Sequence, residues 1–561
     1  MPSVRVFDLL ATGCAIVLCS LPFLAAPAPG NAIRFENRGL GPTQRFVLAN
    51  GTTEDKPVID STLGGVALLD YDNDGYLDIF FTNGASIPSL TKSAPSFYNR
   101  LFHNNRDGTF TDVTARAGLR GAGYSMGVAA ADYDNDGWVD LYVAGVNRNI
   151  LYHNNGDGTF TDATQKAGVS GVYTSGKKPW SVAAAWLDYD NDGRLDLLVV
   201  NYLDWSFAKN QLCGDAGRRV SCTPALYKGE TNILYHNNGD GTFTDVSEET
   251  GIGRHIGKGM SAAIADYDGD GFIDILVTND REPNFLFHNA GGKKFTEVGV
   301  ESAVALTQDG MAVSNMGVDF RDLDNDGWPD VLIAALQGET FLLFFNSGKS
   351  FFTESSYQAG VGYASRQMSG WSVGGYDFDN DGYKDLFTSN SHVSENVHSY
   401  GPERYRQPNA VFRNIRNGQF QDVGRSAGIS MNEAAAHRGS AFGDLNNDGK
   451  VDVVVSAIGS PAEVLYNTGP RANHWLIIQA VGTKSNRDGI GTRIKIVGVS
   501  GLTQYNHVTT AVGYASSSDK RVHFGLGRDA RVRRIELRWP SGKVQVLTDV
   551  ASDQILKVIE P

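Results

Sequence analysis

Short apolar runs recur in pairs along the chain, and an acidic turn separates the two runs of each pair. Small or alternating residues precede the turn, as in GVAAA at 127–131, and a β-branched run follows it, as in ILV at 275–277. A third run ends in an Asn-rich turn and a fourth begins with Phe, as in LYHNNGDGTFTDAT at 151–164. These residue types predict strands, and the Gly-Asp-Gly turn suits a tight hairpin. The pattern therefore predicts units of four antiparallel strands, with an acidic loop between the first two.

The acidic turn follows a nine-residue pattern, D-x-[DN]-x-D-G-x-x-D, that occurs seven times. Four-stranded sheets repeated radially form a β-propeller, so seven copies predict seven blades. The seventh unit ends after 464–467 without a fourth strand, and the segment 33–37 precedes the first unit. We expect that segment to supply the missing outer strand and close the ring, which removes two open sheet edges. The copies begin at Asp70, Asp132, Asp188, Asp266, Asp322, Asp377 and Asp444.

The acidic loops predict calcium sites. Several carboxylates in one short loop repel one another unless a cation lies between them, and the alternative is a solvated acidic turn. Oxygen-only ligands select a hard ion, and about six or seven donors in a flexible loop favour Ca²⁺ over Mg²⁺. The side chains at positions 1, 3, 5 and 9 and the backbone carbonyl at position 7 are the predicted ligands. The full set is Asp70, Asp72, Asp74, Tyr76 and Asp78; Asp132, Asp134, Asp136, Trp138 and Asp140; Asp188, Asp190, Asp192, Arg194 and Asp196; Asp266, Asp268, Asp270, Phe272 and Asp274; Asp322, Asp324, Asp326, Trp328 and Asp330; Asp377, Asp379, Asp381, Tyr383 and Asp385; and Asp444, Asn446, Asp448, Lys450 and Asp452.

Composition and charge fit this interpretation and exclude other classes. The chain has 561 residues, of which 41% are hydrophobic and 65 are Gly, which is enough apolar material for a packed core. With the repeat, this excludes a coiled coil, a helical bundle and a polytopic membrane protein. The net charge of −14 argues against a nucleic-acid partner, and seven Ca²⁺ would add +14. The expected role of the calcium, bound with a Kd of ~10⁻⁴–10⁻³ M as in extracellular modules, is structural rather than catalytic.

The first residues and the cysteines predict export. Residues 1–32 have an apolar stretch followed by small residues, which favours a cleaved signal peptide over a membrane anchor. We expect a secreted chain, extracellular or periplasmic, without a membrane span after cleavage. In an oxidising compartment Cys213 and Cys222 are expected to form a disulfide. Zinc is the alternative, but it needs two further ligands that the local sequence does not offer.

In its acidic loops and repeating strands the chain resembles FG-GAP/VCBS repeat proteins, the integrin-α-like propellers with calcium loops. DGIGTRI at 488–494, HFGLG at 523–527 and WPSG at 539–542 are similar to the ASPIC/UnbV domain of the cartilage acidic protein family and its bacterial relatives. Two departures, His where Arg is expected in LYHNN and Thr492 where Ala is commoner, do not touch the calcium ligands.

The expected organisation is a signal peptide at 1–32, a propeller over 33–470 and an ASPIC/UnbV domain at 471–561. Alternating strands in the last part predict a small β-sandwich without reference to the family. The fold class is therefore all-β, a seven-bladed β-propeller followed by a small β-sandwich domain. The sandwich is locally basic, and we interpret its charges as a solvated strand face, with contact to the propeller or an anionic glycan as the alternative. The charges are those of Arg531, Arg533, Arg534 and Arg538.

The favoured function is a calcium-binding scaffold for binding or adhesion at a surface or in a matrix, with a protein or glycan ligand. The insertion 201–231, with Trp205, Phe207 and the cysteine pair, is the best candidate for a recognition loop. A loop that merely caps the blade is its alternative. For the whole chain, an accessory role in natural-product biosynthesis, as the UnbV name suggests, is a further possibility.

Histidines carry the enzyme alternative. His103, His153, His236 and His288 occupy equivalent places in four units, so they cannot meet at one site, and we interpret them as packing at the blade edge. His255, His392 and His437 break the repeat. Together with Arg254 and Arg438 they could converge on one mouth of the propeller and act on a uronate, as in a polysaccharide lyase.

Overall fold

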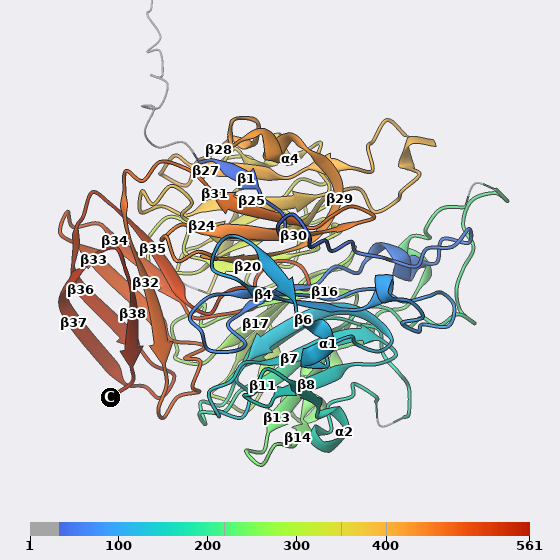
Figure 1. Ribbon diagram of the computed structural model, residues 1–561, viewed down its shortest axis with the longest axis horizontal. Coiled ribbons are helices and arrows are strands. Elements are labelled where there is room, and N and C mark those ends of the chain that lie inside the picture. The colour runs from blue at the N-terminus through green and yellow to red at the C-terminus, as the bar shows by residue number, and fades with distance from the viewer. Residues whose placement is uncertain (1–32, 174, 218, 349, 400) are drawn as a thin grey trace, which may run out of the picture.

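The computed structural model describes residues 33–561 apart from 174, 218, 349 and 400, and it consists almost entirely of strands (Figure 1). The signal peptide expected at 1–32 lies outside the described residues. Among the described residues, every helix falls short of the length and apolarity that a bilayer crossing requires. The α-helical turns are α1 (Thr114–Ala117), α2 (Thr164–Ala167), α3 (Ser247–Thr250) and α4 (Val361–Ser365), and the 3₁₀ turns are Val58–Ser61, Pro95–Phe97, Pro224–Leu226, Ile252–Arg254, Val397–Ser399, Gly424–Ser426 and Ile429–Asn432.

Seven antiparallel sheets of the described chain form the blades, and within each the strands follow one another from the axis outward. Blades one to four are β2 (Val66–Leu69), β3 (Asp78–Phe81), β4 (Arg100–Asn104) and β5 (Phe110–Asp112); β6 (Tyr124–Ala131), β7 (Asp140–Val146), β8 (Ile150–Asn154) and β9 (Phe160–Asp162); β10 (Ser181–Leu187), β11 (Asp196–Asn201), β13 (Ile233–Asn237) and β14 (Phe243–Asp245); and β16 (Gly259–Ala265), β17 (Asp274–Asn279), β18 (Phe285–Asn289) and β19 (Phe295–Glu297). Blades five to seven are β20 (Val318–Arg321), β21 (Asp330–Ile333), β22 (Leu342–Asn346) and β23 (Phe352–Glu354); β24 (Gly370–Tyr376), β25 (Asp385–Asn390), β27 (Ala410–Asn414) and β28 (Phe420–Asp422); and β29 (Ala434–Gly443), β30 (Asp452–Ile458), β31 (Glu463–Asn467) and β1 (Phe35–Asn37). Short strands β12 (Glu230–Thr231), β15 (Ile256–Gly257) and β26 (Gln407–Pro408) lie in the connections.

The ring of blades is closed. Each inner strand lies beside the inner strands of both neighbouring blades, and β2 of the first blade contacts β29 of the last. In blade seven the outer strand comes from the start of the described chain, because β1 pairs antiparallel with β31 through Phe35–Asn467 and Asn37–Leu465. This is the segment in which the sequence predicts the closing strand, and it leaves the last blade with four strands.

Small residues fill the inner strands because the strands converge at the axis. A Cβ added to Gly127 would lie 2.3 Å from the carbonyl oxygen of Val182 in the next blade. At Gly374 it would lie 2.4 Å from the ring of Phe442. The Gly- and Ala-rich runs that precede each acidic turn are therefore a steric requirement of the ring.

The C-terminal residues form a β-sandwich at the left of Figure 1. In β33 buried and partly exposed residues alternate, which is the pattern of a sheet with one covered face. Ile478 and Ile535 of the sandwich share one apolar cluster with Ile264 and Ile273 of blade four. The predicted boundary at 470/471 lies between β31 and β32. One sheet contains β35 (Val522–Gly527), β32 (His474–Val481) and β38 (Gln554–Ile559), and the other contains β34 (Thr503–His507), β33 (Arg493–Gly498), β36 (Arg531–Arg538) and β37 (Val544–Ala551).

Residues 508–521 of the sandwich, here called the axial segment, enter the centre of the propeller. Gly513 exchanges two backbone hydrogen bonds with Val318 of blade five. Ser517 donates its backbone N–H to Val66 of blade one. Tyr514, which is completely buried, donates its hydroxyl to the carbonyl of Thr62. The sequence predicts two consecutive domains, and in the structure the second domain also places one segment inside the first. Backbone groups make most of these contacts, so apolar periodicity gives no signal for them.

Candidate metal centres on the acidic-loop face

Each acidic loop connects the first and second strands of a blade and is held by its own carboxylates. In the first loop Asp70 accepts a hydrogen bond from the backbone N–H of Asp74 at 2.9 Å. Asp78, the first residue of β3, accepts from the backbone N–H of Tyr71 at 3.2 Å and of Asn104 at 2.8 Å. The other loops repeat the two bonds to the ninth residue, which therefore ties the loop to the third strand of its blade.

The carboxylates at positions 1 and 9 of the loops are partly or fully buried, and the loop carboxylates lie close to one another. Oxygens of Asp70, Asp72 and Asp78 all lie within 4.8 Å of one another. Burial raises the pKa of Asp78 to about 7, with Asp72 as a like-charged neighbour. The same cause raises the pKa of Asp140 and Asp274 to about 7. Ionised carboxylates at this spacing are unfavourable without a positive charge among them.

The donors present fit a hard cation. Four buried carboxylate oxygens, one each on Asp72, Asp190, Asp322 and Asp379, have no hydrogen-bond partner among the described residues. Such oxygens cost free energy unless a ligand satisfies them. Side chains at positions 1, 3, 5 and 9 face one region, as the calcium interpretation requires, and these residues could hold the ion.

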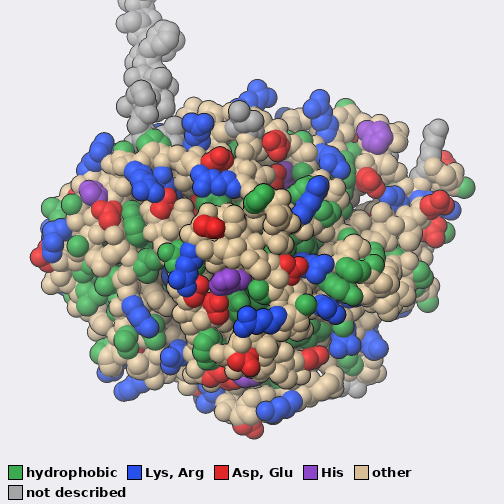
Figure 2. Space-filling view, viewed as in Figure 1, with side chains coloured by type: hydrophobic (Ala, Val, Ile, Leu, Met, Phe, Trp, Pro, Cys, Tyr) green, Lys and Arg blue, Asp and Glu red, His purple; other side chains and the backbone are tan. Residues whose placement is uncertain are grey.

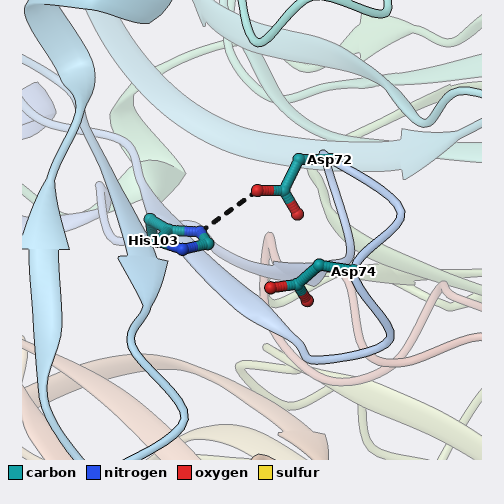
Figure 3. Close-up of side chains that lie close together, drawn as sticks. All are labelled: Asp72, Asp74 and His103. Atoms are coloured by element: carbon teal, nitrogen blue, oxygen red, sulfur yellow. Dashed lines mark ion pairs between the residues drawn. The ribbon is translucent and has the colours of Figure 1, made fainter.

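Four histidines face the acidic loops, which the sequence interpretation missed. Nδ1 of His103 on β4 lies 3.2 Å from Asp78 Oδ1 and 3.3 Å from Asp72 Oδ2, and Figure 3 shows its ring beside Asp72 and Asp74. His153, His236 and His288 repeat this in their own blades, with Nδ1 3.3–3.6 Å from two carboxylates.

These rings also pack edge-on against a tyrosine of the loop, at 6.1 Å between the His103 and Tyr71 centroids. Packing at the blade edge is therefore half of their role. The hydrogen bond to Asp78 raises the pKa of His103. The signal for the other half is the His-Asn pair that recurs at the end of the third strand in four blades, at 103–104, 153–154, 236–237 and 288–289.

Blades five to seven differ at this position. Phe345 and Tyr466 stand there in blades five and seven, and Arg413 stands there in blade six. The guanidinium of Arg413 donates to Asp379 at 2.8 Å and lies 3.5 Å from Asp381. The sixth loop thus contains a permanent internal cation, and the seventh loop has Asn446 in place of an aspartate.

The asparagine that ends the third strand of each blade links that blade to the acidic loop of the preceding blade. The side-chain amide of Asn154 donates to the carbonyl of Tyr71, the second residue of the first loop, at 2.8 Å. The same bond closes the ring between blades one and seven, from Asn104 to Leu445 at 2.9 Å. All seven blades of the described chain make it, with donors Asn104, Asn154, Asn237, Asn289, Asn346, Asn414 and Asn467.

A second set of asparagines, at position 4 of the loops, links each loop to the following one. Asn73 donates to the carbonyl of Gly137 at 3.0 Å, with a left-handed φ of 56° that asparagine tolerates. Six loops make this bond, through Asn73, Asn135, Asn191, Asn325, Asn380 and Asn447. The fourth loop has Gly269 instead, so it has no side chain to bridge to the fifth.

The sandwich covers this face of the propeller. Asp488 accepts from the backbone N–H of Asp132 at 2.8 Å. Arg521 donates to the carbonyl of Asp444, and Arg493 pairs with Asp266 at 3.1 Å. Of the arginines that the sequence singled out, Arg531, Arg533 and Arg534 are exposed on β36, as expected for a solvated face. Arg538 instead lines a cavity between the sandwich and the propeller.

The histidines of the lyase alternative do not form a catalytic group. His437 is completely buried, with Nδ1 3.0 Å from the carbonyl of Gln407 and Nε2 3.1 Å from Glu463. His392 accepts a backbone hydrogen bond from Ser394. His255 packs against two phenylalanines of blade four. An enclosed imidazole whose nitrogens both face protein oxygens cannot reach a polysaccharide.

Long loops gather on the opposite face, where second strands connect to third strands. The insertion 201–231 contains the Cys213–Cys222 disulfide, with 5.3 Å between the Cα atoms, as predicted. Trp205 is buried against Trp180, and Phe207 beside it is 37% exposed. In Figure 1 these loops extend at the right, away from the sandwich. Charged side chains of both signs are interspersed over the face seen in Figure 2.

Comparisons with known proteins give a consistent assignment. A model of the FG-GAP-like repeat matches residues 70–143, 132–199, 225–277, 266–333, 322–388 and 377–455, and a model described as ASPIC and UnbV matches 482–561. Cartilage acidic protein 1 of Mus musculus is 25% identical over 515 residues, which cover 88% of this chain and 73% of that protein. The Homo sapiens protein of that name is 24% identical over 88% of this chain and 71% of its own length. Among solved structures, YCF48 bound to D1 peptide aligns with a TM-score of 0.40 and 9% identity, over 79% of this chain and all of that one.

Proposed function

Because this chain belongs to the family of FG-GAP-like repeat proteins that end in an ASPIC and UnbV domain, we propose that it is an exported, calcium-dependent binding scaffold. Its ligand is a protein or glycan at a cell surface or in a matrix. The propeller supplies a rigid ring, and the face opposite the sandwich carries the recognition loops. The observation that carries the proposal is the contrast between seven regular acidic loops on one face and the long, disulfide-closed insertion on the other.

Calcium is proposed at the acidic loops on the basis of their donors. The loops offer carboxylate oxygens, some of them buried and without a partner, and a hard cation satisfies such oxygens. Loops one to five have four aspartates at the ligand positions and no internal guanidinium bound to two of them. We expect these five to bind more tightly than the sixth, with Arg413, and the seventh, with Asn446.

Ligand recognition is proposed for the insertion and its neighbours. Phe207, Leu212 and Leu226 expose 37%, 53% and 55% of their surface, and such side chains on an ordered loop are typical contact residues. Asn396 of the blade-six loop donates to the carbonyl of Arg219, and Ser221 reaches Asp60. Three loops therefore hold one another in place.

A glycan and matrix-protein array tests this proposal. The variant Phe207→Ser/Leu212→Ser/Leu226→Ser should lose calcium-dependent retention while keeping the native melting temperature. The control Val544→Ser/Val546→Ser changes side chains that are 52% and 40% exposed on the sandwich and should bind normally. Equal retention of both variants would exclude the insertion as the recognition site.

A further inference from the structure

The junction between blades four and five breaks the regularity of the loop face. Gly269 takes the place of the bridging asparagine, with φ at +80°. The ring of Trp328 from the fifth loop lies where that side chain would start, since a Cβ on Gly269 would be 3.0 Å from it. At the other six junctions the asparagine side-chain amide donates a hydrogen bond to a glycine carbonyl of the next loop.

A cavity of about 320 Å³ opens at this junction, between the two loops and the sandwich. Its volume is at the lower end of small-molecule sites, enough for a molecule of one or two rings. Trp328 of the propeller and Tyr505 of the sandwich supply aromatic surface to its wall. Tyr505 closes the cavity beside Gly327, where an added Cβ would lie 3.2 Å from the tyrosine ring.

The polar groups of the cavity are divided between its two walls. The sandwich contributes Arg493, Lys495, Glu536 and Arg538. Arg493 pairs with Asp266 and Arg538 lies 3.5 Å from Glu536, whereas Lys495 has no hydrogen bond or ion pair with any described residue. Its ammonium lies 5.2 Å from the ring centroid of Tyr505. The propeller contributes Asp266 and Asp322, the first residues of the fourth and fifth acidic loops, which are already assigned to the proposed metal sites. A complementary ligand therefore has an anionic group for Lys495 and a ring for the aromatic wall.

We propose that this cavity binds a hexuronate, a monosaccharide whose carboxylate pairs with Lys495 and Arg538 and whose ring packs on Trp328 and Tyr505. Aromatic side chains present apolar faces to sugar rings, and a charge-assisted hydrogen bond fixes the carboxylate. The site is distinct from the recognition loops, which lie on the other face of the propeller. It lies at the junction of the described chain where the repeat has Gly269 in place of the bridging asparagine.

Calorimetric titration and saturation-transfer NMR with galacturonate and glucuronate test the proposal, with galactose and glucose as neutral probes. We expect saturable binding of at least one uronate, and about tenfold weaker binding of the neutral sugars. Lys495→Met should weaken uronate binding about tenfold, because it removes the cation and keeps the length of the side chain. The matched control is Lys557→Met, on the exposed surface of the sandwich.

Two further variants separate a site from a general loss of structure. Trp328→Ala should lose binding, whereas Trp138→Ala, at the same position of the second loop, should not. Gly269→Asn places a side chain where the Trp328 ring lies and displaces that ring, so uronate binding should be lost. The Phe207/Leu212/Leu226 variant should bind uronate normally, which distinguishes this site from the recognition loops. Absence of saturation by either uronate, equal binding of neutral sugars, or undiminished binding by Gly269→Asn would overturn the proposal.

Discussion

The two faces of the propeller are built on different principles. On the loop face seven blades repeat the same aspartates, the same asparagine bridges and nearly the same distances, and the sandwich covers them. On the opposite face the connections differ in length from blade to blade, and one of them carries a disulfide. Repetition is retained where every blade must solve the same physical problem, namely buried charge and ring closure. Variation is found where only backbone continuity is required.

Each face of the propeller has one exception to this contrast. Within the loop face, Gly269 breaks the asparagine ring and a cavity opens there. Near the opposite mouth, Arg438 is fully buried, with its guanidinium 4.1 Å from the ring centroid of Trp371. That arginine donates to the carbonyl of Ser61, so it joins the irregular loops to the ring.

Removal of divalent ions should have the largest effect, because it acts on all the loops at once. At ~1 mM Ca²⁺ and a Kd of ~0.1 mM each occupied site stabilises the native state by ~1.4 kcal/mol, so seven sites would contribute ~10 kcal/mol. Excess EDTA should lower the melting temperature by many degrees in differential scanning calorimetry, and added Ca²⁺ should restore it. A melt that does not change would mean that the loop face does not depend on metal.

Loss of the axial tyrosine should have the next largest effect. Tyr514 is fully buried, its ring centroid is 5.1 Å from that of Trp371, and it bonds to the backbone of blade one. Tyr514→Ala should lower the free energy of unfolding in urea by about 3–5 kcal/mol. Tyr363→Ala, at a position that is 73% exposed, should change it by less than about 0.5 kcal/mol. Similar changes in the free energy of unfolding for the two variants would contradict a structural role for the axial segment.

Two adjacent asparagines give a sharper test of the bridges. Asn104 is buried and donates to the carbonyls of Leu77 and Leu445, whereas Asn105 is exposed and donates to the hydroxyl of Thr109. Asn104→Ala should cost about 2–3 kcal/mol in urea unfolding, because it leaves two buried carbonyls unpaired. Asn105→Ala should cost well under 1 kcal/mol, as surface changes do. If the order is reversed, the inter-blade bridges do not stabilise the loop face.

Acid should loosen the contact between the two domains. His507 of the sandwich is buried, with Nε2 3.1 Å from the carbonyl of Ile264, and burial lowers its pKa to about 3. Its unfolded pKa is about 6.5, so its contribution is complete above that pH and is lost as pH falls toward 3. Between pH 6.5 and 5 the loss is about 2 kcal/mol, since each pH unit corresponds to about 1.4 kcal/mol. His507→Gln should flatten the dependence of urea unfolding on pH in that range; a wild-type slope in this variant would contradict the assignment.

The sequence predicts the repeating unit well and the contacts between units poorly. Aspartate spacing, strand-like runs and the orphan segment at 33–37 predict the blades and the closing strand, because each is a local pattern or a missing partner. The histidines of strands β4, β8, β13 and β18 have equivalent positions, but their direction depends on strand register. That register follows from pairings such as His103 with Thr111, which composition does not reveal.

The axial segment and the two sets of bridging asparagines make the contacts between units that the sequence interpretation did not predict. Gly513 and Ala515 bind neighbouring blades through backbone groups, which any residue possesses, so no residue type marks them. The asparagines recur in the sequence at position 4 of six acidic loops and at the end of each third strand. A buried amide at a fixed place in every repeat indicates a bond between repeats, and that signal was available.

The metal content of the purified, untreated protein tests the central claim most directly. Elemental analysis should return about five to seven equivalents of calcium per chain, because five of the seven loops have four aspartates at the ligand positions and no guanidinium paired with two of them. Fewer than about three equivalents in a protein that keeps its native melting temperature would contradict the account, since the loop face would then be stable without the ions it is proposed to hold.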